Sequence, residues 1–435
     1  MKPMTQQNYY QASAGPAESY PAASAHGEVE VAIVGGGYAG LATALGLAER
    51  GVHGVCLLEA EQLGFGASGR NGGFVFAGFS LSEAELLRQL GVDHARRLYA
   101  ATQRAVALVR QRIQRYQIDC DLVDQGVIWA NWFRDPELLR SRQALLANAF
   151  ASHWQRLSVD ELHQRIASAR YHGGLFEADA LHLHPLKWAR GLGRAAAAQG
   201  VAIHEQSPVN RLQKVAGRWQ LGTQSGTLIR ARQVVLCCGG YLAGLHPRID
   251  RSVLPVATYV MATEPLGNQL EACFPGTRAA VYDSRFAFDY YRPLLDTRLL
   301  WGGRISVLDR SAAAVARLLR GDMMQVFPQL ADVKIDFAWS GLMSYARHEM
   351  PQVGQIEPGL WCAQAFGGHG LATTLAAGEV IAAAIAEHDP AIQDYAAFGL
   401  PWAGKPFGYA AAQLSYSWMQ WRDRFKDFRE SRLAR

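Results

Sequence analysis

The chain has 435 residues, 49% of them hydrophobic and 19% charged, and its formal net charge is +5. This is an ordinary composition for a globular protein of two or three domains, and because the positive charge is not gathered into one segment, we expect no nucleic-acid partner. The six cysteines form no CxxC pair, which disfavours zinc and thioredoxin-like chemistry and fits a reducing cytoplasm. We expect neither a signal peptide nor an integral membrane segment.

The first 27 residues are rich in Ala, Ser, Pro and Gln, which predicts an extended N-terminal arm. The pairs Tyr9-Tyr10 and Tyr20-Pro21 could hold this arm against a surface.

Residues 31–59 have the pattern of a strand, a helix and a second strand. Apolar runs at 31–34 and 55–58 predict buried parallel strands, and residues 41–50 predict the helix between them. A G-x-G-x-x-G motif follows the first strand, and an acidic residue ends the second, about 20 residues later. The segment therefore predicts a dinucleotide-binding unit, for which NAD is the default ligand.

Each motif residue has a physical role in such a unit. Gly35 permits the tight turn, Gly37 leaves room for a pyrophosphate, and Gly40 allows helix and strand to pack closely. The helix N-terminus presents N–H groups and the positive end of its dipole to phosphates. Glu59 would accept hydrogen bonds from ribose hydroxyls.

A glycine-rich stretch, residues 63–73, comes directly after this unit. Its small residues cannot form a core, but they let the backbone approach a flat ligand closely. Ser68, Arg70 and Asn71 add hydrogen-bond donors. A flexible surface loop is the alternative, and the position directly after Glu59 favours ligand binding.

The middle of the chain predicts alternating elements. We expect a capping box at Ser82 and Glu85. Helices are expected at 93–116, 136–150, 185–199 and 311–326, and strands at 123–132, 201–204, from Val209, near Trp219, near Leu228 and at 234–238. The last strand ends in Gly239-Gly240, a second glycine pair able to face a phosphate or adenine.

His182 and His184 form an H-x-H pair that could suggest a metal. Without a third ligand nearby in sequence, a structural role is favoured over zinc.

Aromatic-rich strands then follow one another at 255–264, 280–281, 286–291 and 299–303 without an intervening helix. This predicts a mainly antiparallel sheet. Five polar side chains in it are candidates for contact with a substrate: Tyr259, Tyr290, Tyr291, Arg292 and Arg304.

Near the C-terminus, the strand expected at 360–366 ends in Gly367-Gly368-His369-Gly370 and leads into a helix at 371–388. This second strand–glycine–helix element can direct its N-terminus at an anionic group. The tail predicts an amphipathic helix whose apolar stripe is Leu414, Trp418, Trp421, Phe425 and Phe428. We favour docking of this helix on the protein itself or on a partner subunit over membrane contact, because acidic residues are mixed into the segment.

The predicted fold class is α/β, with a Rossmann-like dinucleotide-binding domain and a mainly antiparallel substrate domain. The dinucleotide-binding domain would comprise 28–82, 170–240 and 338–392, and the substrate domain 83–169 and 241–337. Residues 1–27 would form the arm and 393–435 the tail.

Taken together and in this order, VAIVGGGYAG…LLE, GFGASGRNGG, AWSGL…MPQVG and GGHG resemble the FAD-dependent D-amino-acid oxidase/glycine oxidase superfamily. The Tyr-Tyr arm, GASGRNGG and DYYRPLLDTRLLWGGR are similar to the γ-glutamylputrescine oxidase branch. The resemblance covers nearly the whole chain and changes the expected cofactor from NAD to FAD. It implies that the Rossmann-like domain is an FAD-binding domain of the glutathione-reductase/D-amino-acid oxidase type.

The resemblance implies a set of cofactor contacts. The ADP half, the pyrophosphate and the flavin ring would be held by Gly35, Gly37, Tyr38, Ala39, Gly40, Glu59, Ala60, Gly66, Ala67, Ser68, Gly69, Arg70, Asn71, Gly72, Gly73, Val209, Cys238, Gly239, Gly240, Gly341, Gly367, Gly368, His369, Gly370 and Leu371. The substrate-side and catalytic candidates are His369, Tyr259, Tyr291, Arg292 and Arg304. Arg292 or Arg304 could clamp a carboxylate, and each has a surface ion pair as its alternative. His369 could be a base or a structural residue at a helix start.

Three departures from relatives matter. Gly368 stands where relatives commonly have serine. No histidine in the first glycine loop is placed to bind flavin covalently, and Cys362 is expected to be buried, so FAD should be non-covalent. Residues 298–301, which match the segment where sarcosine oxidases have an oxygen-activating lysine, contain none.

The resemblance implies hydride transfer from an amine or amino acid to flavin N5, giving an imine, then an aldehyde or keto acid, with oxygen reduced to H2O2. γ-Glutamylputrescine is one substrate of this kind. A dehydrogenase that passes electrons to a quinone or carrier is the second hypothesis, and a non-catalytic flavoprotein that acts as a sensor or tRNA-modification partner is the third. The partners would be a small-molecule amine and oxygen or another acceptor, with a possible homo-oligomer, in the cytoplasm.

Overall fold

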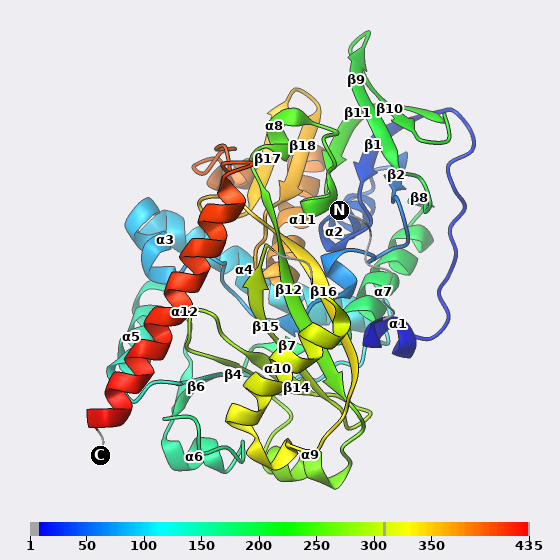
Figure 1. Ribbon diagram of the computed structural model, residues 1–435. Helices are drawn as coiled ribbons and strands as arrows, with labels where there is room; N and C mark the ends of the chain where they lie inside the picture. The colour runs from blue at the N-terminus through cyan, green and yellow to red at the C-terminus, as the bar shows by residue number, and fades with distance from the viewer. Residues whose placement is uncertain (1–7, 308–309, 434–435) are drawn as a thin grey trace.

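Two eight-stranded sheets organise the computed structural model, which describes residues 8–307 and 310–433 (Figure 1). The first sheet has the order β17-β18-β11-β1-β2-β8, and its five strands from β18 to β8 are parallel. These strands are β17 (Gln352–Glu357), β18 (Leu360–Gln364), β11 (Leu228–Leu236), β1 (Gly27–Val34), β2 (Val55–Leu58) and β8 (Ala202–His204), and β10 (Arg218–Thr223) and β9 (Val209–Val215) extend β11 as an antiparallel meander. The predicted strand–helix–strand unit and its parallel pairing are confirmed.

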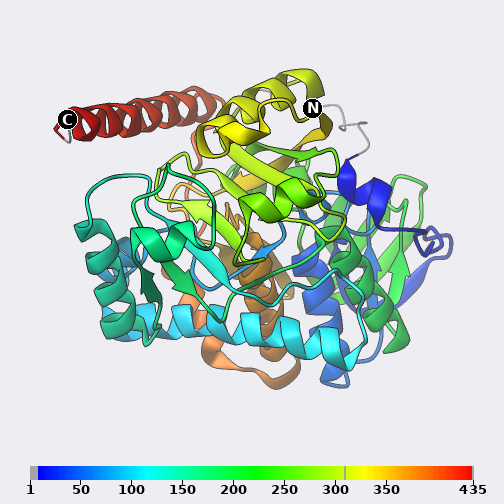
Figure 2. The same ribbon diagram turned by 90° about the horizontal axis from the view of Figure 1, so that it is seen from below.

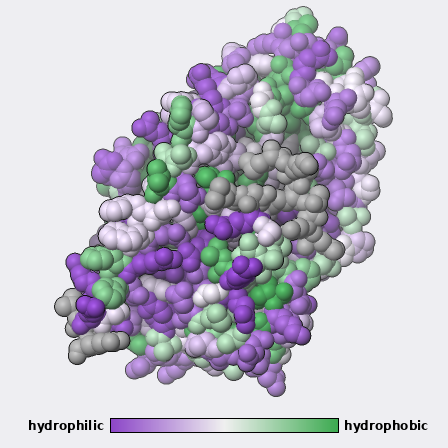
Figure 3. Space-filling view, viewed as in Figure 1, coloured by the Kyte–Doolittle hydropathy of each residue, from purple (hydrophilic) through white to green (hydrophobic). Residues whose placement is uncertain are grey.

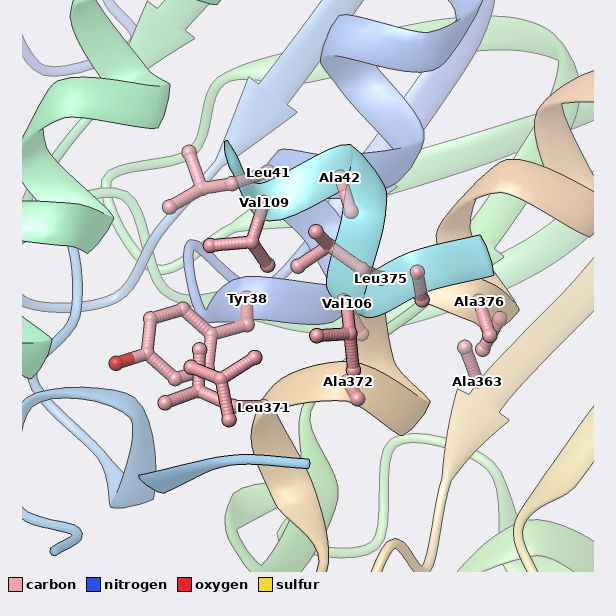
Figure 4. Close-up of a cluster of buried hydrophobic side chains, with 14 of the residues drawn as sticks. Tyr38, Leu41, Ala42, Val106, Val109, Ala363, Leu371, Ala372, Leu375 and Ala376 are labelled. Atoms are coloured by element: carbon pink, nitrogen blue, oxygen red, sulfur yellow. The ribbon is translucent and has the colours of Figure 1, made fainter. Parts of the chain in front are cut away.

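Helices α2 (Tyr38–Glu49), α4 (Val92–Arg115) and α11 (Gly370–Glu387) pack together beside this sheet. Figure 4 shows how Leu41 of α2, Val109 of α4 and Leu375 of α11 converge in one apolar cluster. Among the described residues, α11 is the one helix long and apolar enough to cross a membrane, but 67% of it is buried inside the protein. Its apolar surface is therefore accounted for by core packing.

The second sheet has the order β16-β12-β15-β14-β13-β4-β6-β5 and is antiparallel except between β13 and β4. The mainly antiparallel sheet is thus confirmed, although the strand expected at 286–291 is shifted to Tyr290–Pro293. The strands are β16 (Ile335–Tyr345), β12 (Leu254–Thr263), β15 (Leu299–Ser306), β14 (Tyr290–Pro293), β13 (Ala280–Asp283), β4 (Val127–Ala130), β6 (Gly174–Glu177) and β5 (Gln155–Leu157).

Strands β6 and β16 belong to the second sheet, although they lie wholly or mostly within segments predicted for the FAD-binding domain. The chain therefore passes between the two sheets more often than the predicted domain boundaries imply. Those boundaries remain a prediction.

The helices expected at 136–150, 185–199 and 311–326 are present, but two expectations are wrong. Residues 9–13 of the arm form a helix, and so do residues 268–273, between two strands expected to follow one another directly. Ser82 caps α3 through the Glu85 N–H at 3.4 Å, and Pro185 opens α7. Bounds are α1 (Tyr9–Ser13), α3 (Glu83–Leu90), α5 (Glu137–Phe150), α6 (Val159–His163), α7 (Pro185–Ala198), α8 (Pro247–Asp250), α9 (Asn268–Cys273) and α10 (Ala312–Val326), with a small pair β3 (Phe74–Val75) and β7 (Leu181–His182) and 3-10 turns at Ala67–Gly69, Gly239–Tyr241, Pro328–Leu330 and Pro390–Tyr395.

The N-terminal arm contacts both sheets. The rings of Tyr9 and Tyr10 pack edge-on against Phe337 and Trp339 of β16, at 5.7 and 5.4 Å between centroids. Further along, Ala23 is hydrogen-bonded through its N–H to Ser207 and through its carbonyl to Thr227, next to β9 and β11. The two tyrosines thus hold the arm as expected, and residues 1–7 of the predicted arm lie outside the described residues.

The tail forms one long helix, α12 (Gly408–Leu433), along the edge of the second sheet (Figures 1 and 2). It contacts the body through its polar side, where Tyr416 and Asp423 are buried. The predicted apolar stripe faces away from the rest of the chain, so the expectation that it docks on the protein itself is wrong. Residues 434–435 lie outside the described part.

Candidate active site

One cavity of about 1890 Å³ extends from the first sheet to the second. Val34 and Leu58, the last residues of the parallel strands β1 and β2, lie at one end of it, where α/β sheets bind ligands. Tyr290 of β14 and Arg304 of β15 lie at the other. The volume exceeds that of typical drug-sized sites, which is roughly 300–1,000 Å³, so a dinucleotide and a small substrate can share it.

The turn between β1 and α2 is built for close backbone approach. Gly35 has φ +109°, and a Cβ there would lie 2.7 Å from the carbonyl oxygen of Cys237. A Cβ on Gly40 would lie 2.0 Å from the carbonyl oxygen of Gly35, so only glycine fits. The turn thus leaves the N-terminal turn of α2 facing the cavity.

Glu59 lines the cavity next to this turn. Its carboxylate accepts N–H groups of Gly36 at 2.5 Å and Glu61 at 2.9 Å, which fix its orientation. Burial raises the pKa of this carboxyl, while the two backbone donors oppose that rise. Each oxygen of this carboxylate can still accept a further hydrogen bond from a hydroxyl group in the cavity.

The glycine-rich loop after β2 is held by its own side chains. Asn71 donates to the carbonyl oxygens of Ala67 and Ser68, both at 3.0 Å, and accepts the N–H of Gly73 at 2.8 Å. Arg70 donates to the Phe65 carbonyl at 3.1 Å. These contacts exclude the alternative of a loop without fixed structure.

The second glycine element lies between β18 and α11. Gly368 donates its N–H to Ser80 Oγ at 2.8 Å, and His369 is the residue before the first turn of α11. The His369 ring meets Phe76 edge-on at 4.7 Å, and burial lowers the pKa of this imidazole to about 4. His369 is therefore neutral near pH 7.

An aromatic wall lines the cavity beside His369, whose ring contacts one of its members, Phe76. We use this name for Phe74, Phe76, Tyr282, Phe288 and Tyr290, whose rings contact one another in a closed series at centroid distances from 5.4 to 6.4 Å. All five line the cavity. Of these, sequence reasoning singled out only Tyr290, because the others belong to segments that meet only in the folded chain.

Arg304 lines the cavity, but its guanidinium already forms a two-point pair with Asp322 of α10, at 2.8 and 2.5 Å. Asp322 is buried, so the pair fixes the position of Arg304 and neutralises its charge.

Three predicted substrate-side residues do not line the cavity. The ring of Tyr291 stacks on Trp301 at 4.4 Å and its hydroxyl donates to Tyr171, while Tyr259 is buried in the same apolar cluster. Arg292 donates to the carbonyl oxygen of Gly72 at 2.6 Å and to the hydroxyl of Tyr10 at 3.4 Å. Arg292 is thus corrected from a substrate clamp to a buried support of the glycine loop, and the two tyrosines are corrected to core residues.

Most predicted cofactor residues converge on the cavity, whereas Gly40, Gly69 and Gly73 lie behind its surface. Those that line it are Gly35, Gly37, Tyr38, Ala39, Glu59, Ala60, Gly66, Ala67, Ser68, Arg70, Asn71, Gly72, Val209, Cys238, Gly239, Gly240, Gly341, Gly367, Gly368, His369, Gly370 and Leu371.

The histidine pair has structural partners. His182 contacts the Arg278 carbonyl through Nε2 at 2.8 Å, and His184 accepts the Lys187 N–H through Nδ1 at 3.2 Å, capping α7. Within the described ranges, no group of three or more His, Cys, Asp or Glu side chains could hold a metal.

Comparisons with known proteins agree with this geometry. Residues 30–384 match the DAO family, described as FAD dependent oxidoreductase. The chain is 31% identical to the probable oxidoreductase OrdL of Haemophilus influenzae over 96% of this chain and 97% of that protein. It is 33% identical to the gamma-glutamylputrescine oxidoreductase of Escherichia coli over 86% of this chain and 88% of that protein.

The fold is similar to that of glycine oxidase from Geobacillus kaustophilus, with a TM-score of 0.73 and 24% identity, over 86% of this chain and 98% of that one. The structural likeness supports the fold, and the family match over most of the chain supports the cofactor class. The chain belongs to the DAO family of FAD-dependent oxidoreductases.

Proposed function

We propose that this protein oxidises the C–N bond of a small amine or amino acid and holds FAD non-covalently. The observation that supports this most is that one continuous cavity is lined both by the glycine-rich segments expected to bind a dinucleotide and by the aromatic wall. The E. coli relative is named for γ-glutamylputrescine, so a γ-glutamylated or otherwise substituted aliphatic amine is our first substrate class.

The chain's donor set fits FAD in order along the cavity. Glu59 would bind the ribose of the ADP half, and the first turn of α2 together with Ser68 would face the pyrophosphate. Val209 and Gly239 would border the adenine. The start of α11 would meet the flavin ring, where its helix dipole favours negative charge.

When bound, FAD would supply the oxidising chemistry, as the acceptor of a hydride from the carbon next to the amine nitrogen. The protein residues orient the amine for this step. The aromatic wall lines this part of the cavity, and aromatic rings attract an amine cation more than an acidic group. We assign His369 a positioning contact, because an imidazole whose pKa is about 4 is a weak base for an amine proton.

The thiols of the chain fit a non-covalent cofactor. Cys237 and Cys238 line the cavity at the dinucleotide end, and burial raises the pKa of Cys238 to about 12, so its thiol is neutral. Cys362 lies in β18 with its thiol directed at the Gln352 carbonyl. We expect denaturation to release all the flavin into the supernatant, and flavin that stays with the protein would contradict this part of the proposal.

Oxygen is our first electron acceptor, and a quinone or carrier protein is the second. The dehydrogenase hypothesis is favoured by one observation, since no lysine is among the described residues that line the cavity. A flavoprotein without turnover is the remaining alternative. The cytoplasm is our proposed location.

The deciding experiment mixes the holoprotein with candidate amines without oxygen and follows bleaching of the flavin. The panel contains γ-glutamylated polyamines, N-methyl amino acids and D-amino acids. Bleaching followed by rapid reoxidation and peroxide in air would support the oxidase, and slow reoxidation would favour the dehydrogenase. Failure of every amine to bleach bound flavin would overturn the proposal.

A further inference from the structure

The polar side of α12 is used to attach the helix to the body. Tyr416 accepts the N–H of Ile305 at 2.8 Å, and Asp423 accepts the N–H of Phe286 at 2.7 Å. Further along, Asp427 pairs with Arg170 at 2.7 Å and Glu430 accepts the N–H of Arg134 at 2.6 Å. All three acidic residues of α12 are therefore engaged by the protein.

The opposite side of α12 is apolar and exposed. We call the residues Leu414, Trp418, Trp421, Phe425 and Phe428 the outer stripe, and their exposed fractions are 72, 61, 54, 52 and 54%. Trp421 stacks between Trp418 and Phe425 at centroid distances of 5.2 and 5.5 Å, which makes a continuous row of rings. At 1.5 Å per residue the stripe is about 21 Å long. An exposed apolar surface of this kind marks an interaction site.

The exposed charges beside the outer stripe have one sign. Arg422, Arg424, Arg429 and Arg432 are exposed, and no exposed charged residue in the described part of α12 is acidic. Acidic residues in an amphipathic helix oppose membrane contact where they face the membrane. In α12 the acidic side chains face the body of the protein instead.

We propose that the outer stripe and its arginines bind an anionic membrane surface as a reversible peripheral contact. Trp, Phe and Leu would enter the boundary between headgroups and acyl chains, while the arginines bind lipid phosphates. A second copy of the chain is a less complementary occupant, because a symmetric contact would bring the same arginine-flanked face opposite itself.

The position of α12 leaves this face open to a flat surface. Figure 2 shows the helix at the margin of the molecule, and Figure 3 shows apolar and weakly polar side chains along its course. Trp402 and Phe407, exposed by 56 and 79%, precede the helix and line the cavity. Membrane contact would therefore occur beside one wall of the active-site cavity. This proposal does not depend on which substrate is oxidised.

The test is co-sedimentation of the full-length holoprotein with vesicles. We expect binding to phosphatidylcholine vesicles that contain phosphatidylglycerol, little binding to phosphatidylcholine alone, and weakening when the ionic strength rises from about 0.1 M to about 1 M. Replacing Trp418, Trp421 and Phe425 by serine should abolish binding. The independent pair Arg424→Ala and Arg429→Ala should weaken it by roughly 30-fold.

Matched controls distinguish vesicle binding through the outer stripe from non-specific adsorption to vesicles. Val215→Ser with Leu295→Ser removes exposed apolar residues elsewhere, Arg230→Ala removes an exposed arginine elsewhere, and both should bind as the wild type does. Absence of binding to the anionic vesicles would overturn the proposal. So would equal binding to both lipid mixtures. Self-association in sedimentation velocity that the serine variant abolishes, without vesicle binding, would instead identify an interface between copies.

Discussion

Ser68 Oγ accepts the backbone N–H of Tyr38 at 3.0 Å, so the glycine-rich loop is tied to the first residue of α2. Both residues line the cavity, and both belong to segments that we propose to face the pyrophosphate. The loop and the helix N-terminus therefore form one binding surface.

Ser68→Ala should weaken FAD binding by roughly fivefold, because a hydrogen bond of this kind contributes about 1 kcal/mol. Titration of FAD into the apoprotein, followed by flavin fluorescence, measures the change. Ser225→Ala is the matched control, since Ser225 contacts Thr223 and Thr227 away from the cavity. Equal affinities of the wild type and Ser68→Ala would contradict the proposed role.

Gly40→Ala should lower the free energy of unfolding by about 3 kcal/mol or more, because its Cβ would lie 2.0 Å from the Gly35 carbonyl oxygen. Gly321 is the matched helical control. A Cβ there meets nothing within 4 Å, so Gly321→Ala in α10 should raise stability by about 0.5–1 kcal/mol. Urea denaturation of the two apoproteins measures both values, and a stability of Gly40→Ala close to that of the wild type would show that the turn can relax.

Glu177 predicts a pH dependence of stability. Burial raises the pKa of this carboxyl to about 8, and within the described residues its Oε2 has no hydrogen-bond partner. The folded state therefore retains a proton that the unfolded state releases near pH 4.5, the ordinary pKa of a glutamate. The protonated carboxyl therefore makes its full contribution to the free energy of unfolding below pH 4.5. As the pH rises from there toward about 8, this contribution falls by up to about 1.4 kcal/mol per pH unit.

Glu177→Gln removes this titration. Urea unfolding between about pH 5 and about pH 8 should show the wild type losing stability relative to the variant by that slope. Glu137→Gln, at a side chain exposed by 62%, should leave the wild-type slope unchanged. Parallel pH profiles for the wild type and Glu177→Gln would show that the carboxyl is already ionised in the folded protein.

His369→Gln should preserve the pH profile of flavin reduction between about pH 6 and about pH 9, because the imidazole stays neutral throughout. The rate should fall by no more than roughly tenfold, as expected for a positioning contact, whereas a general base typically contributes about 10²–10⁴-fold. Anaerobic stopped-flow absorbance with an amine identified by bleaching provides both readouts. Loss of an ionisation near about pH 6.5, the ordinary pKa of histidine, would instead identify a catalytic base.

The dinucleotide end of the site could be predicted because its requirements are local. Gly35, Gly40 and Glu59 belong to one strand–helix–strand unit, so their spacing in sequence largely fixes their spacing in the structure. The strand–glycine–helix element around His369 is local in the same sense. The pairing of the two sheets and the burial of Arg292 required contacts between distant segments.

Periodicity identifies the faces of an element without stating which face is buried. In β14, Tyr290 lines the cavity while the adjacent Tyr291 points into the apolar cluster around Trp301, and only pairing with β15 decides between them. The same limit applies to the tail, where periodicity identifies the apolar stripe but the folded chain leaves that stripe exposed. Hydrogen bonds from Ile305 and Phe286 to α12 select the polar face for docking.

The N-terminal arm limits how a substrate can reach the cavity. Tyr9 and Tyr10 contact β16 of the second sheet, and Ala23 is hydrogen-bonded to Ser207, next to β9 of the first sheet. The arm therefore connects the two sheets. A hinge that opened the sheets would have to break these contacts together. Exchange of substrate and product is therefore expected to use local movement of the segment around Phe407, which is exposed and lines the cavity, without separation of the two sheets.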